Sequence, residues 1–158
     1  MKFKEAVEKT LHLEKSYVAG LQALRAEDRP HINAEDTRKL TGSVDVDAAL
    51  RAADPHGHRW DFAIAYQHKN RKEETIYWVE LHTASDSQVS VVIKKAQWLS
   101  SWLKGGGAPL AKFERDIVWL SSGSTTFTLS APQKKQMAQV GLQHHGLRLR
   151  ITNERDDY

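Results

Sequence analysis

The chain has 158 residues, a formal net charge of +3 and no cysteine. A single domain is therefore expected, without a disulfide framework and without a thiolate metal site. No stretch approaches the roughly 20 apolar residues of a membrane span, and the charged start lacks the apolar core of a signal peptide. These features predict a cytoplasmic protein with no membrane partner. The mildly basic charge permits a nucleic-acid partner without requiring one.

Residues 4–26 have the spacing of an amphipathic helix that ends before Pro30. Apolar side chains recur at helical spacing, and Lys and Glu residues occupy the other face. Solvent-exposed positions are expected for the glutamates. If the helix packs beside a sheet, however, Glu8 or Glu14 could reach a site on that sheet as an accessory group.

The segment 41–53 fits two structures. Val44 and Val46 alternate with polar residues, as in a short strand. A short helix over residues 48–53, with Asp45 or Asp47 as its N-cap, fits as well. These two aspartates are therefore expected to cap or to face solvent; the alternative is a third metal ligand or a group that orients a substrate.

Residues 60–82 predict a β-hairpin, because two short runs rich in β-branched and aromatic residues flank an all-polar segment. Folding the segment symmetrically between residues 70 and 71 places Asp61 opposite Glu80. Since side chains alternate along a strand, His82 and Trp78 share the face of these two acids.

Two carboxylates in directly opposed positions would have Cβ atoms roughly 4.5–5.5 Å apart and would repel each other. A hard divalent cation such as Mg²⁺ or Mn²⁺, which prefers oxygen ligands, would relieve the repulsion between Asp61 and Glu80. The alternative is that one carboxylate points to solvent or pairs with Arg59.

A long helix is predicted over residues 88–104, ended by the glycines at 105–107. Lys94 and Lys95 lie in its first half, near the end of the strand that carries Glu80; the alternative is that both are simply solvated. The apolar run 116–120 is typical of a buried strand. A strand, a long helix and a further strand predict a parallel crossover.

The C-terminal part predicts one more helix and one more strand. Ser130 and Gln133 form a capping box before a helix that is expected to reach His145. Residues 147–151 alternate strictly and predict a half-exposed strand, and the charged tail 153–158 is expected to fray.

The order of elements and the acidic pair resemble the PD-(D/E)xK, or restriction-endonuclease-like, superfamily. The resemblance covers residues 3–122 and implies an α/β protein with a mixed sheet and an α-β-β-β-α-β core; residues 130–152 would be a peripheral helix and strand. The stretches 42–45, 59–61 and 78–82 are also similar to a group of uncharacterised bacterial proteins.

The resemblance implies that Asp61 and Glu80 bind a magnesium-type ion, assisted by the backbone carbonyl of Leu81. His82 stands where the family has lysine. A histidine could act as a base or a hydrogen-bond donor. Alternatively, Lys94 or Lys95 could supply the missing charge from the helix, as in some members of the superfamily, or catalysis has been lost.

Two functions follow from the resemblance. One is a metal-dependent nuclease that hydrolyses phosphodiester bonds in DNA or RNA, with the basic residues of segment 69–72 and Lys94–Lys95 facing the nucleic acid. The other is a catalytically inactive domain of the same fold that binds nucleic acid or a protein partner. His82 favours the inactive domain, and the opposed acids favour the nuclease.

Overall fold

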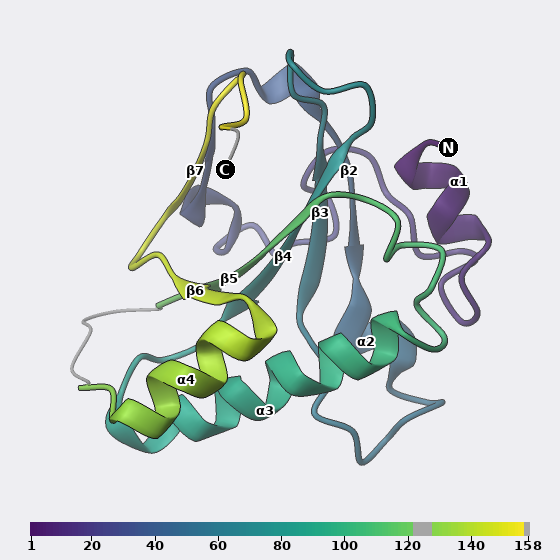
Figure 1. Ribbon diagram of the computed structural model, residues 1–158. Helices are drawn as coiled ribbons and strands as arrows, with labels where there is room; N and C mark the ends of the chain where they lie inside the picture. The colour runs from purple at the N-terminus through teal and green to yellow at the C-terminus, as the bar shows by residue number, and fades with distance from the viewer. Residues whose placement is uncertain (122–127, 157–158) are drawn as a thin grey trace.

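A five-stranded mixed sheet with helices packed on one face forms the centre of the computed structural model, which describes residues 1–121 and 128–156 (Figure 1). Strands β2, β3 and β4 are antiparallel neighbours, and β5 and β6 continue the sheet in parallel with β4. Strands β1 and β7 pair in parallel as a separate two-stranded sheet. The strands are β1 Ile32–Ala34, β2 Leu40–Asp45, β3 Phe62–Tyr66, β4 Thr75–Leu81, β5 Arg115–Leu120, β6 Leu142–His144 and β7 Leu149–Ile151.

Four α-helices lie among the described residues: α1 Phe3–Glu8, α2 Val46–Leu50, α3 Asp86–Leu103 and α4 Ala131–Val140. Helices α3 and α4 lie side by side along the same face of the sheet (Figure 1). None of these helices has the length and apolarity needed to cross a membrane. These helices and the mixed sheet confirm the expected α/β architecture.

The sheet separates two hydrophobic cores, because alternate side chains of each strand point to opposite faces. One core contains Ala63 and Trp78 together with the buried stripe of α3. The other contains Ile64 and Val79 and is closed by β1, β7 and Leu24. Because the central strands are covered on both faces, they carry apolar residues at almost every position.

The predicted hairpin register is confirmed. Phe62 pairs with Val79 at one end of the β3–β4 ladder, and Tyr66 pairs with Thr75 at the other. Asp61 and Glu80 occupy the next position beyond the first of these pairs. The prediction succeeded because the all-polar segment between the two apolar runs marks the turn, and a turn centred there fixes the register.

The prediction of a helix over residues 4–26 is wrong beyond Glu8. His12 has a φ of 72°, which a right-handed helix does not permit, and Gly20 also has a positive φ. Val18 forms two backbone hydrogen bonds with Ser43 on β2, at 2.9 and 3.1 Å. The apolar residues after the first helical turns therefore pack against the sheet instead of forming one helical stripe.

Segment 41–53 contains both of the structures considered for it. Strand β2 runs to Asp45, and helix α2 begins at the next residue. Asp45 is the N-cap: its Oδ1 accepts a hydrogen bond of 2.9 Å from the backbone N–H of Ala48. The helix is shorter than expected and begins two residues earlier.

The C-terminal helix is shorter than predicted, because Gly141 caps it in the left-handed conformation (φ 70°). The capping box at Ser130 is confirmed. His144, expected at a helix end, instead lies in β6. Since β6 pairs with β5, it forms the edge strand of the main sheet, whereas β7 belongs to the two-stranded sheet with β1.

The first residues of the tail are held in place and do not fray. The guanidinium of Arg155 forms two hydrogen bonds with the Asp116 carboxylate on β5, at 2.8 and 3.1 Å. The side chain of Arg155 is only 11% exposed. The last two residues of the tail, and Ser122 at the expected end of the core, lie outside the described part of the chain.

Candidate active site

Asp61 and Glu80 meet where the β3–β4 ladder ends. The backbone N–H of Asp61 donates to Glu80 Oε1 (3.1 Å), and the backbone N–H of Leu81 donates to Asp61 Oδ2 (3.1 Å). Side-chain oxygens thus take the place of the next backbone ladder bonds. The expected proximity of the two acids is present, on the sheet face that α3 covers.

Lys95 reaches this acidic pair from α3. Its Nζ lies 3.3 Å from Asp61 Oδ1 and also forms an ion pair with Glu80 Oε2. Glu80 is fully buried, and the Lys95 side chain is only 15% exposed. The three charged groups therefore form one compact cluster that is largely withdrawn from water.

The groups of the cluster shift one another's pKa values. Burial, followed by the negative charge of Glu80, raises the pKa of Asp61 to about 7, although the Lys95 ammonium opposes the shift. Burial by itself would lower the pKa of Lys95, but the charges of Glu80 and Asp61 outweigh burial and raise it. Lys95 is therefore a permanent cation beside an acid that is partly protonated near neutral pH.

His82 borders the cluster on the Glu80 side. Its Nδ1 lies 3.7 Å from Glu80 Oε2, and its Nε2 lies 2.6 Å from Oε1 of Gln88 in the first turns of α3. The neighbouring Glu80 carboxylate raises the pKa of His82, which is half-buried. His82 therefore lies beside Glu80, and its contact with Gln88 orients the ring.

The remaining aspartates near the site have structural partners. Asp45 caps α2, and burial raises its pKa. Asp47 forms ion pairs with Arg51 (2.8 Å) and Arg59 (3.0 Å). Arg59 therefore neutralises Asp47, and the alternative that it pairs with Asp61 is not what the structure has.

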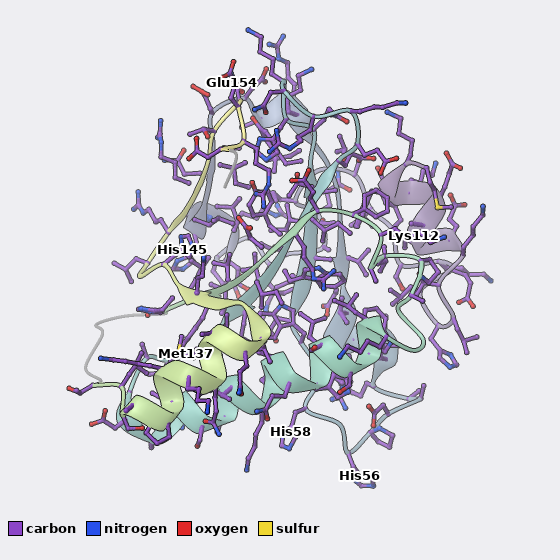
Figure 2. The ribbon with its side chains drawn as sticks, viewed as in Figure 1. His56, His58, Lys112, Met137, His145 and Glu154 are labelled. Atoms are coloured by element: carbon purple, nitrogen blue, oxygen red, sulfur yellow. The ribbon has the colours of Figure 1, made fainter. Side chains whose placement is uncertain are left out.

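Three predicted accessory or catalytic residues lie away from the cluster. Glu8 and Glu14 are exposed, in α1 and in the turns that follow it. Lys94 is also exposed, whereas its neighbour Lys95 faces the acids. The loop histidines His56 and His58 are exposed as well; in Figure 2 they lie on the loop between α2 and β3 and project away from the sheet.

The basic residues of the hairpin turn lie at the opposite end of β3 and β4 from the cluster. Strand β3 spans five residues, so at about 3.4 Å per residue the turn is roughly 15–20 Å from Asp61. Arg71 in this turn pairs with Glu114 at 3.0 Å. The structure therefore separates the two basic patches that were expected to face one ligand.

The donor set at the cluster suits a hard cation. Asp61 and Glu80 supply carboxylate oxygens, and Mg²⁺ is commonly held by one or two carboxylates together with waters and substrate phosphates. Within residues 1–121 and 128–156, no group of three or more His, Asp or Glu side chains forms a ready-made metal cage. An ion site here would therefore be an open one with two protein carboxylates.

Two features of the site were missed in the sequence. Gln88 precedes Lys95 by seven residues, two helical turns, and that spacing could have revealed a shared face on α3. The second is a contact of 2.6 Å between Ser121 Oγ and His144 Nε2 at the same end of the parallel strands. This contact forms because β6 pairs with β5, and no local sequence pattern indicates that pairing.

Comparisons with known proteins give no relative from which the role of this site can be taken. No protein-family model, no curated protein and no solved structure matches the chain.

Proposed function

We propose that this chain is a divalent-metal-dependent nuclease that hydrolyses phosphodiester bonds in DNA or RNA, with a restriction-endonuclease-like core. The observation that carries the proposal is the convergence of Asp61, Glu80 and Lys95 at one end of the hairpin. Two acids and a lysine are the groups that the resemblance requires. The lysine comes from α3 and not from the strand position that His82 occupies.

The expected order of elements supports the same proposal. With β1 and the short helix α2 set aside as insertions, helix α1, the antiparallel strands β2, β3 and β4, the long helix α3 and the parallel strand β5 have the order of an α-β-β-β-α-β core. Asp61 immediately precedes β3 and Glu80 lies near the end of β4, which matches the places of the two acids in the pattern that the chain resembles. Strand β6 and helix α4 would then be an elaboration that widens the sheet.

The residues would divide the chemistry as follows. Asp61 and Glu80 would hold a Mg²⁺ or Mn²⁺ ion, together with the carbonyl of Leu81 as the resemblance implies. Such an ion polarises a scissile phosphate and lowers the pKa of a bound water. The Lys95 ammonium would stabilise negative charge that develops on the phosphate. His82, oriented by Gln88, would hold or accept a proton of the attacking water.

The test is cleavage of a panel of supercoiled DNA, single-stranded DNA and RNA in the presence of Mn²⁺. Wild type should cleave at least one substrate, and Glu80→Gln and Lys95→Met should each reduce the rate by about 100-fold or more. Lys94→Met, which removes the same charge from the exposed face of α3, should retain activity. Cleavage that is unaffected by Glu80→Gln would contradict the proposal.

A second candidate is a catalytically inactive domain that binds nucleic acid or a protein partner. It is favoured by His82, which replaces the strand lysine and pairs with Glu80 in the resting structure. This candidate predicts that a folded protein binds the ion without cleaving any nucleic acid on the panel.

A further inference from the structure

The four carboxylate oxygens of the acidic pair have distinct partners. Asp61 Oδ2 and Glu80 Oε1 accept hydrogen bonds from the backbone N–H groups of Leu81 and Asp61. The other two oxygens, Asp61 Oδ1 and Glu80 Oε2, both contact the ammonium of Lys95. The Lys95 ammonium thus joins the two oxygens that are not tied to the backbone, and His82 Nδ1 lies farther away, 3.7 Å from Glu80 Oε2 alone.

Because the two acids are largely buried, they need a cation beside them. Glu80 is fully buried and the Asp61 side chain is 22% exposed, so water cannot screen their repulsion well. Arg59, another cation close to the site in sequence, is committed to Asp47. His82 lies beside Glu80 only, so Lys95 is the cation that contacts both acids in the structure.

We propose that Lys95 is an internal counter-cation of the Asp61–Glu80 pair, and that a divalent ion binds this site only by displacing the Lys95 ammonium. The inference rests on the proposed function, because it concerns the same ion site. An ion that joins the two acids must take the oxygens that Lys95 holds. If a dication and the Lys95 ammonium contacted the same two oxygens, they would repel each other strongly in a site of low dielectric.

Displacement is mechanically simple for this side chain. A lysine carries its charge on a flexible four-carbon stem, and α3 does not have to move for the stem to rotate. The displaced ammonium then lacks an anionic partner, and the phosphate of a bound phosphodiester would supply one. Ion binding would thereby release Lys95 toward the substrate, so that Lys95 governs both ion affinity and substrate contact.

The test is calorimetric titration of Mn²⁺ into the apo-protein. Lys95→Met should bind Mn²⁺ about 10-fold more tightly than wild type or better, since the competing cation is gone. Lys94→Met is the matched control: it removes an identical charge one residue away, without touching the acids, and should bind within about twofold of wild type.

Lys95→Gln keeps the inference testable if Lys95→Met folds poorly. Mn²⁺ should raise the Tm of Lys95→Gln by more than it raises the Tm of wild type, because the ion then replaces a missing charge. Equal affinities for wild type and Lys95→Met, with binding lost in Glu80→Gln, would overturn displacement and leave the ion site intact. Absence of Mn²⁺ binding in wild type and in both folded Lys95 variants would overturn the ion site itself.

Discussion

Asp61 is held in a place that disfavours its charged form. Its pKa rises from 3.8 to about 7, mainly through burial and then through the charge of Glu80. Such a rise in pKa changes the free energy of unfolding by about 4 kcal/mol across the pH range between the two values. Because the folded protein holds this proton more tightly than the unfolded chain, the stabilisation is complete below about pH 4 and is lost as the pH rises through 7.

Replacing Asp61 by asparagine should therefore stabilise the apo-protein in alkaline solution. We expect the free energy of unfolding of Asp61→Asn to exceed that of wild type by on the order of 2 kcal/mol at pH 8, and by much less at pH 4.5. Asparagine keeps an oxygen that can accept from the Leu81 N–H. Denaturant unfolding at the two pH values measures the difference, and a gap that does not change with pH would contradict the assignment of the raised pKa to Asp61.

The β3–β4 hairpin is the element that the sequence specifies best, because two short apolar runs flank one all-polar turn and the centre of that turn sets the register. The face shared by Asp61, Glu80 and Trp78 could be predicted for this reason. The N-terminal segment was mispredicted because its apolar spacing fits a helix, while contacts with β2 decide its actual path. Helical spacing also placed both Lys94 and Lys95 near the site, but only packing against the sheet distinguishes the buried one.

The path of the N-terminal segment along β2 can be tested at Gly42. A Cβ at this position would lie 2.2 Å from Cε2 of Tyr17, whose hydroxyl donates to the Thr41 carbonyl at 2.6 Å. Gly42→Ala should therefore lower the free energy of unfolding by about 1–3 kcal/mol. In a double-mutant cycle, Tyr17→Ala should remove much of that cost; strictly additive effects would contradict the packing of Tyr17 on β2.

On the scale of the whole molecule, the sequence predicted the mixed sheet and the parallel crossover, but not how the C-terminal part joins them. Strand β6 has three residues and pairs with β5 across α4, so it has no local signature. The hydrogen bond between the side chains of Arg155 and Asp116 likewise links residues 39 positions apart. Contacts of this range depend on the assembled fold, which short-range patterns do not encode.

The arrangement of the whole molecule also limits where a nucleic acid would be engaged. The Asp61–Glu80–Lys95 cluster lies at one end of the central strands, under α3, and the basic hairpin turn lies at the other. A substrate would therefore be held close to Lys95 and His82, and not by both basic patches at once unless it extends along the sheet.

Anomalous diffraction from a crystal of the protein soaked in Mn²⁺ would locate the ion and Lys95 together. We expect an anomalous peak between the carboxylates of Asp61 and Glu80, with the Lys95 ammonium moved away from both. Glu80→Gln crystals treated in the same way should show no peak. A wild-type map without a peak at saturating Mn²⁺, and with Lys95 still bridging the two acids, would rule out the displacement of Lys95 by a bound ion.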